Sequence, residues 1–472
     1  TERPNLMRTV SGEVYRTTVM AKLVGLALLK FATLDPLGMG IEMEAGKPGW
    51  YDALNGLPGL FGSSLCETYE LERLLAFLLE GAVDKSERTL ELPQEQYLLL
   101  GEVEHALIAW NASSTADRDH LYWDAVATAR ETYRAAVRFG FSGQTAALTF
   151  DRLSLLLNGF RAKVRSGIAR AVEMNDGLPP TYLAYTVTDY ELVTDAAGAP
   201  QQDERGRSHV RVKGFEPRLL PLFLEGPVHA LRVESDLGRA RQLYTHIRAS
   251  ELFDQKLGMY KVNGPLQGQS HEIGRARAFT PGWLENESIW LHMEYKYLLE
   301  VLRAGLYGEF FQDLEQMLIP FQDPAVYGRS PLENSSFLAS SAHPDVSLHG
   351  NGFVARLSGA TAEFLSIWNL MMAGERPFFV QDGELCLAFR PVLPAWLFDQ
   401  AGTVAFMFLG HTRVIYHNPE RHDISQDSGA VIRRCVLYLQ DERRIEVSGS
   451  LIAAPYAELV RAGKVNQIKV YL

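Results

Sequence analysis

The change of pattern within residues 359–389, GATAEFLSIWNLMMAGERPFFVQDGELCLAF, decides the fold class. Its first half carries apolar residues at helical spacing, and its second half holds two short β-rich runs, Phe378 to Val380 and Glu384 to Phe389. Similar runs separated by turns continue to the end of the chain, so we predict a β-sandwich over residues 376–472. The chain is therefore predicted to be mainly α with a C-terminal β domain.

Residues 1–375 show a helical period and are predicted to form one domain of helix hairpins. One excursion, at about residues 182–215, alternates apolar and polar residues and predicts a β-hairpin. The loops at residues 255–283 and 320–357 are long, and long loops in a compact domain often carry function. The helices are predicted at residues 12–34, 65–83, 93–111, 116–139, 145–174, 234–249, 284–304, 308–318 and 359–373.

The composition limits the partners of the chain. A net charge of -11 argues against the basic face that nucleic acid or an anionic membrane surface would need, and 47% hydrophobic residues suffice for large cores. The most apolar segment, residues 19–34, contains two lysines and predicts a buried helix rather than a membrane span. Cys66, Cys386 and Cys435 are far apart and odd in number, which indicates a reducing compartment without a disulfide framework. We expect a cytoplasmic protein.

Residues 48–62, PGWYDALNGLPGLFG, set Asp52 beside Trp50 in a loop rich in Gly and Pro. The indole of Trp50 offers an apolar face on which a sugar ring can stack. We expect the same indole to shield Asp52 from water, which favours a carboxylic acid that donates a proton near neutral pH. A surface loop with a buried tryptophan and a capping aspartate is the alternative.

Two further segments carry candidate ligand groups. Residues 279–292, FTPGWLENESIWLH, lead into a predicted helix that would place Glu285 and His292 on one face; an acidic first turn with Asn286 as its cap is the alternative. Ser358 and Gly359 begin another predicted helix, where free backbone N–H groups can bind phosphate, or where Ser358 is an ordinary cap. Asn334, in the polar run of residues 333–336, is a candidate for sugar binding.

Together these segments resemble the inverting disaccharide and oligoglucan phosphorylases of the cellobiose-phosphorylase type. The resemblance spans roughly residues 12–472 and implies an (α/α)6 barrel, incomplete in this chain, followed by a β-sandwich. The matching positions are Trp50 and Asp52, then Glu285, Asn286, Ile289 and His292, and then Ser358 and Gly359.

The resemblance also implies a reaction, the inverting phosphorolysis of a β-linked glucan or oligosaccharide to α-glucose 1-phosphate. Asp52 would be the general acid and inorganic phosphate the nucleophile, so that neither a base nor a cofactor is needed. Glu285, Trp50 and Asn334 would bind the sugar. His292, Ser358 and Gly359 would bind phosphate. No metal is expected, because no cluster of His, Cys and Asp shows ligand spacing.

Several alternatives remain open at this point. The usual N-terminal β-sandwich of this family, and an Arg-His pair at its phosphate site, would lie upstream of Thr1. The chain is therefore the C-terminal portion of a longer enzyme, or a second polypeptide completes the barrel, or the protein is inactive alone; a homodimer is a further arrangement. An inverting glycoside hydrolase or glucan-remodelling enzyme, with Glu287 as base, is the second reaction considered. A non-catalytic glycan-binding or partner subunit is the third function considered.

Overall fold

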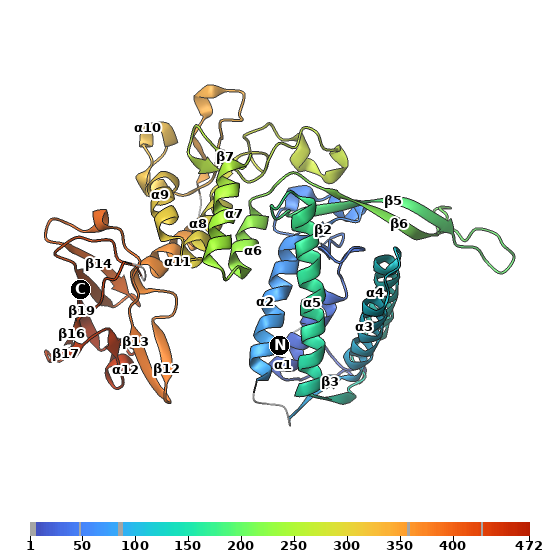
Figure 1. Ribbon diagram of the computed structural model, residues 1–472, viewed down its shortest axis with the longest axis horizontal. Coiled ribbons are helices and arrows are strands. Elements are labelled where there is room, and N and C mark those ends of the chain that lie inside the picture. Colours follow the sequence, from blue (N-terminus) through green and yellow to red (C-terminus); the bar gives the residue numbers. More distant parts are fainter. Residues whose placement is uncertain (1–5, 47–48, 84–87, 356–358, 426–427) are drawn as a thin grey trace. The chain divides into compact units, whose positions relative to one another are not determined.

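The structure is a computed structural model that describes residues 6–46, 49–83, 88–355, 359–425 and 428–472. It divides into two compact units (Figure 1). The first comprises Thr1–Tyr297 and Phe337–Asn351, and the second comprises Leu298–Ser336 and Gly352–Leu472. The described residues mix α-helices with several small sheets, and they do not close a barrel of helices.

The helices of the first unit pack around an extended apolar core. The long helices α2 and α5 lie side by side (Figure 1), and Phe31 of α1 stacks on Phe160 of α5 with ring centroids 4.0 Å apart. The side chains of Thr18 and Thr149 accept hydrogen bonds from the first turns of α1 and α5. Among the described residues, every helix is too short or too polar to cross a membrane. The helices are α1 (Val19–Phe31), α2 (Leu65–Ala82), α3 (Gln94–Ala112), α4 (Arg118–Ala136), α5 (Phe150–Met174), α6 (Glu225–Val233), α7 (Leu237–Ala249) and α8 (Leu291–Arg303), the last of which runs into the second unit.

An antiparallel sheet with the order β1-β2-β5-β6 fixes the base of the loop that holds Asp52. Strands β1 and β2 pair through Ile41 and Ser64, so the chain leaves and rejoins the sheet at one place, and Met43 N donates to Gly62 O at 2.8 Å. Strands β5 and β6 form a long hairpin where the sequence predicts one (Figure 1). The strands of this unit are β1 (Ile41–Glu42), β2 (Ser63–Ser64), β3 (Thr89–Pro93), β4 (Thr145–Thr149), β5 (Tyr182–Leu192), β6 (Val210–Leu219), β7 (Phe253–Asp254), β8 (Met259–Tyr260) and β9 (Ile289–Trp290).

The predicted helices at residues 12–34 and 145–174 begin too early, and one helix of the first unit is missed; α1 begins only at Val19. Residues 145–149 are strand β4 rather than the start of a helix, because they pair with β3 along its whole length. Helix α6 was not predicted, since Gly226 and Pro227 break the helical pattern of the sequence. Proline is tolerated in the first turn of a helix, where its missing N–H has no partner to lose.

In the second unit, helices are followed by two sheets after Ala373. A five-stranded sheet has the order β14-β15-β19-β16-β17, in which only β15 and β19 run parallel, and a three-stranded sheet has the order β12-β13-β18. Tyr416 of β15 donates a hydrogen bond to the carbonyl of Met372 at the end of α11. The elements are α9 (Tyr307–Met317), α10 (Pro324–Tyr327), β10 (Ser335–Leu338), β11 (Gly352–Ala355), α11 (Gly359–Ala373), β12 (Phe378–Gln381), β13 (Glu384–Ala388), β14 (Thr403–Phe408), β15 (Thr412–His417), β16 (Arg434–Leu439), β17 (Arg444–Ser448), β18 (Leu451–Ile452), α12 (Tyr456–Arg461) and β19 (Val465–Tyr471).

Candidate functional site

The loop of residues 49–62 is compact and has its own apolar underside. It forms two short 3-10 helices, Asp52–Leu54 and Leu57–Leu60. Tyr51, Leu54 and Leu57 are buried in a cluster with residues of β5 and of the 262–276 segment. The buried side chains hold the loop rigidly, which leaves Asp52 on its outer surface.

Two glycines let this loop approach the segment of residues 271–278 closely. The N–H of Gly56 donates to Ile273 O at 3.1 Å, and a Cβ added to Gly56 would lie 1.8 Å from the carbonyl oxygen of Glu272. Gly274 adopts a φ of 126°, and a Cβ there would lie 2.5 Å from Ala53 O. No other residue type fits either position without displacing backbone.

This contact brings Arg275 and Glu285 to Asp52. Arg275 Nη2 lies 3.0 Å from Asp52 Oδ2, and both side chains are more than half exposed. Glu285 is also hydrogen-bonded to Asp52; burial, and then the Asp52 charge, raise the pKa of the Glu285 carboxyl to about 7. Among the described residues, the buried Oε2 of Glu285 has no hydrogen-bond partner. The Glu285 carboxyl therefore keeps its proton up to about neutral pH.

The expectation that Trp50 shields Asp52 is wrong. The Asp52 side chain is 56% exposed, and the neighbours of the indole are aromatic rings. The ring centroid of Trp50 lies 5.8 Å from that of His292 and 6.4 Å from that of Trp290, in edge-on geometry. Of the two carboxyls, the half-buried one is Glu285, because the loop turns Asp52 outward.

The prediction that Glu285 and His292 share a helix face is also wrong. Helix α8 begins at Leu291, and Glu285 lies in an irregular turn before β9. Leu284 and Glu287 have φ angles of 50° and 58°, which a helix does not allow. Asn286 is not a cap, since its side chain donates to Phe279 O at 2.8 Å.

Glu287, the base considered for a hydrolase, is held in a buried ion pair. Its Oε1 lies 3.0 Å from Lys261 Nζ, and its side chain is 6% exposed. Its backbone N–H donates to Asn263 Oδ1 at 2.7 Å. This carboxylate is poorly placed to activate a water molecule, since both its charge and its backbone are engaged.

The remaining predicted site residues belong to the second unit. Gly359 is the first residue of α11, and Ser358 lies outside the described residues. Asn334 Nδ2 donates to Thr361 Oγ1 in the first turn of the same helix at 3.4 Å. The structure thus gathers Trp50, Asp52, Glu285 and His292 in the first unit, and it joins Asn334 to the start of α11 in the second.

Sequence reasoning missed Arg275, the cation that contacts Asp52. The residue lies within the loop of residues 255–283, whose length marks it as functional, but one arginine in such a loop gives no signal of its own. The pairing of Arg275 with Asp52 becomes evident only from the structure, where Gly56 and Gly274 each pack against the backbone of the facing segment.

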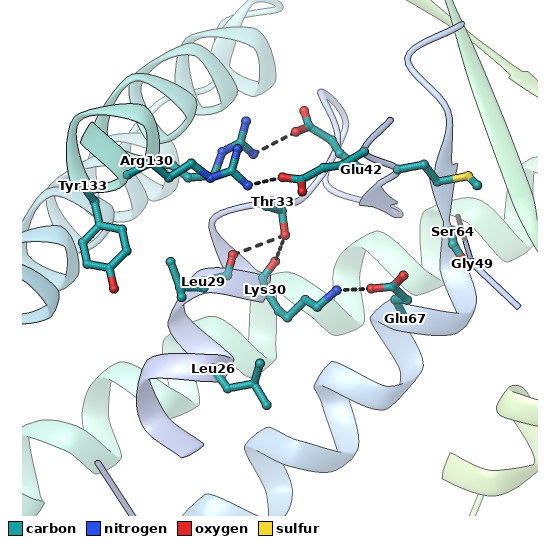
Figure 2. A pocket seen from close by; sticks show the side chains of 13 residues that line it. Leu26, Leu29, Lys30, Thr33, Glu42, Gly49, Ser64, Glu67, Arg130 and Tyr133 are labelled. Carbon is teal, nitrogen blue, oxygen red and sulfur yellow. Dashed lines mark hydrogen bonds and ion pairs between the residues drawn. The ribbon is translucent and has the colours of Figure 1, made fainter. Parts of the chain in front are cut away.

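A cavity of about 350 Å³ lies elsewhere in the first unit (Figure 2). Its lining includes Gly49, at the entry to the loop, together with Lys30 of α1 and Glu67 of α2, which form an ion pair. Neither Asp52 nor Glu285 lines it. The cavity is therefore distinct from the carboxyl pair.

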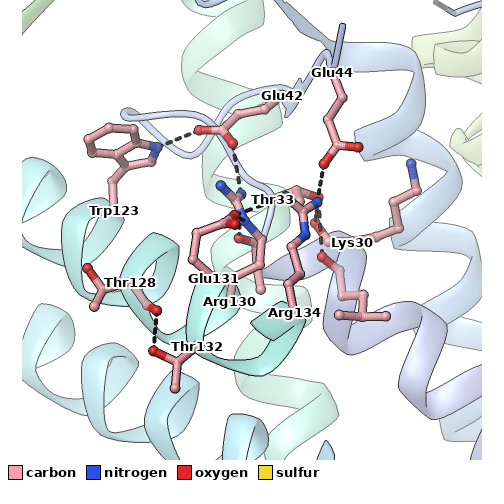
Figure 3. A network of polar contacts seen from close by, with 12 residues as sticks. Lys30, Thr33, Glu42, Glu44, Trp123, Thr128, Arg130, Glu131, Thr132 and Arg134 are labelled. Atoms are coloured by element: carbon pink, nitrogen blue, oxygen red, sulfur yellow. Dashed lines mark hydrogen bonds and ion pairs between the residues drawn. The ribbon is translucent and has the colours of Figure 1, made fainter. Parts of the chain in front are cut away.

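A polar network beside this cavity anchors the chain before the loop (Figure 3). Arg130 of α4 lies 2.8 Å from Glu42 of β1, and Trp123 Nε1 donates to the other oxygen of Glu42 at 2.6 Å. Arg134 pairs with Glu44. Both arginines already have carboxylate partners, so we assign this network a structural role rather than anion binding.

Comparison with known proteins gives no family for the chain. No protein-family model matches it, and no curated protein matches its sequence. One solved structure, described as an uncharacterized conserved protein from Thermus thermophilus, aligns with 78% of this chain and 94% of its own, at 10% identity and a TM-score of 0.27. This similarity is too weak to carry an argument about fold or function.

Proposed function

We propose that the first unit carries a glycan-cleaving site in which Asp52 is the general acid and inorganic phosphate is the nucleophile. The product would be α-glucose 1-phosphate, released from a β-linked glucan or oligosaccharide with inversion at the anomeric carbon. The observation that carries the proposal is the contact between Asp52 and Glu285, two residues of separate motifs, in the same unit as Trp50 and His292. The finer architecture that belongs to this proposal is an (α/α)6 barrel completed by further helices, followed in the chain by a β-sandwich.

The carboxyl pair suits the proton transfer that the reaction needs. As the glycosidic bond breaks, its oxygen takes a proton from Asp52, and a phosphate oxygen forms the new bond to the anomeric carbon on the opposite face. The raised pKa of Glu285, about 7, keeps a proton on this carboxyl up to about neutral pH. Glu285 can then return a proton to Asp52 or hold a sugar hydroxyl, and Trp50 forms an aromatic wall beside the sugar.

The phosphate site of this proposal comes from the resemblance. Of the residues that it assigns to phosphate, His292 lies in the first unit, and it is the one that this proposal uses. Arg275, which is 54% exposed, has further N–H donors besides the one engaged with Asp52. Since phosphate attacks the face opposite Asp52, these donors lie on the acid's side of the sugar, where they can bind a sugar hydroxyl.

The geometry favours phosphorolysis over inverting hydrolysis. An inverting hydrolase holds its two carboxyls about 6.5 to 9.5 Å apart, so that a water molecule fits between one of them and the sugar. Asp52 and Glu285 are directly hydrogen-bonded, and Glu287 is buried against Lys261. A phosphate nucleophile needs no such base.

The test compares Asp52→Asn with a matched control, Glu272→Gln. Glu272 is an exposed carboxylate of the neighbouring 271–273 turn that contacts Ser270. We expect Asp52→Asn to lower glucose 1-phosphate formation from β-linked oligoglucan by about 10²-fold or more, while calorimetry still detects oligosaccharide binding. Glu272→Gln should keep the wild-type rate. An active Asp52→Asn variant would refute the assignment of the acid.

A further inference from the structure

A second cluster of reactive side chains lies in the first unit, away from the carboxyl pair. The side chains of Cys66, Glu225 and His229 bring one sulfur, one carboxylate oxygen and one imidazole nitrogen to within 4.8 Å of one another. Cys66 is in the first turn of α2, whereas Glu225 and His229 are four residues apart on α6. The two helices are in contact, and residues four apart share a helix face. Three donor atoms of different kinds thus converge between two helices.

Each of the two α6 side chains is oriented by a further hydrogen bond. His229 Nδ1 lies 2.8 Å from Glu70 Oε1, which leaves Nε2 directed at the cluster, 3.9 Å from Glu225 Oε1. Tyr182 Oη donates to Glu225 Oε2 at 2.9 Å, so that Oε1 is the oxygen turned toward His229. In metal sites, a ligating imidazole usually donates its other N–H to a carboxylate, and a ligating carboxylate usually accepts a further hydrogen bond.

We propose that Cys66, Glu225 and His229 bind a zinc ion. A mixed set of sulfur, nitrogen and oxygen donors is typical of zinc, and one thiolate with one carboxylate balances its two positive charges. In a tetrahedral zinc site the donor atoms are on the order of 3.5 Å apart, as follows from bond lengths of about 2.0 to 2.3 Å. The three donor atoms would therefore move together by roughly 1 Å, and water would take the fourth position.

The sequence gives little sign of this site, because Cys66 and His229 are distant in the chain and α6 itself was not predicted. Once α6 is known, two short motifs face each other. Helix α2 carries Cys-x-x-x-Glu, in which Glu70 is the carboxylate behind His229, and α6 carries Glu-x-x-x-His. The expectation of no metal rested on spacing along the sequence alone.

The cluster connects to the loop that holds Asp52. The ring of Tyr182 packs against the ring of Tyr51, with centroids 6.4 Å apart, and Tyr51 precedes Asp52. A zinc ion would join α2 to α6 beneath this loop and fix the position of Tyr182. With water as its fourth ligand the site is open rather than closed, and it is independent of the reaction proposed above.

The test uses the full chain, purified without chelators and exchanged against cobalt(II). We expect about one equivalent of zinc in the purified protein by elemental analysis. Cobalt should give the near-ultraviolet absorption band of a thiolate bound to the metal. Cys66→Ser should lose this band, whereas the control Cys386→Ser, which removes a buried cysteine of the second unit, should retain it.

A second variant keeps the test decisive if Cys66→Ser fails to fold. Glu70→Gln leaves all three ligands in place and removes only the carboxylate behind His229. We expect it to bind zinc about 10 to 100-fold more weakly in competition with a chromophoric chelator. Wild-type protein that takes up no stoichiometric zinc or cobalt, a cobalt band that persists in folded Cys66→Ser, or unchanged zinc affinity in Glu70→Gln would each overturn the proposal.

Discussion

At the scale of single residues, Glu285 determines how the carboxyl pair responds to pH. Its pKa is raised to about 7 because the carboxyl is largely buried and lies beside Asp52. The proposed reaction draws on the proton held by Glu285, so its rate should fall as the pH rises through about 7. Glu285→Gln cannot ionise, and we expect it to shift this alkaline limb. The measurement is the pH profile of kcat/KM for glucose 1-phosphate formation.

The same shift predicts a pH-dependent change in stability. Because the pKa of Glu285 is higher in the folded state than its ordinary value of 4.5, the folded protein binds more protons between these two pH values. The group therefore lowers stability progressively as the pH rises from about 4.5 to 7. Glu285→Gln should raise the Tm relative to wild type at pH 8 and have less effect at pH 4.5.

The control for this stability prediction is Glu272→Gln, which removes an exposed carboxylate from the adjoining turn. Its Tm difference from wild type should not depend on pH over the same range. If Glu285→Gln and Glu272→Gln behave alike at pH 8, the pKa of Glu285 is not raised as described.

At the scale of elements, the close backbone approach at Gly56 positions the whole loop. A Cβ at this residue would lie 1.8 Å from Glu272 O, so Gly56→Ala must separate the loop from the 271–278 segment. We expect a loss of about 1 to 3 kcal/mol in the free energy of unfolding, measured by urea denaturation, together with loss of activity.

The matched control is Gly59→Ala in the same loop, since a Cβ there meets no atom within 4 Å. We expect its stability to stay within about 0.5 kcal/mol of wild type. Equal stability of the two variants would mean that the loop does not pack on the 271–278 segment as described.

The elements also show what the sequence could predict. The start and end of α11 and the β5–β6 hairpin were evident because their apolar periods run without interruption between turn residues. The start of α8 could not be predicted, because Leu284 and Glu287, whose φ angles are positive, lie in a stretch that still has helical spacing. Strand β4 was missed because its pairing with β3 is a tertiary contact.

For the site itself, the sequence identified Trp50, Asp52, Glu285 and His292, which the structure brings together in the first unit. It assigned the wrong environment to Asp52, because burial depends on how the loop is turned. It also missed Arg275. This residue reaches Asp52 because the loop and the 271–278 segment pack closely at Gly56 and Gly274.

At the scale of the whole molecule, the division into two units does not follow the order of the sequence. Residues 337–351 belong to the first unit, although a predicted long loop surrounds them. Phe337 stacks on Trp290 with nearly parallel rings, 5.8 Å apart, and Ser341 N donates to Asp254 Oδ2 at 2.7 Å. Such contacts between distant residues leave no periodic trace in the sequence.

The central claim is that phosphate, rather than water, attacks the sugar. The most direct measurement is NMR of the full chain incubated with β-linked oligoglucan, with and without inorganic phosphate. The account predicts that α-glucose 1-phosphate appears in step with chain shortening, and that no sugar is released without phosphate. Free glucose released at the same rate in both conditions, or no cleavage in either, would contradict it.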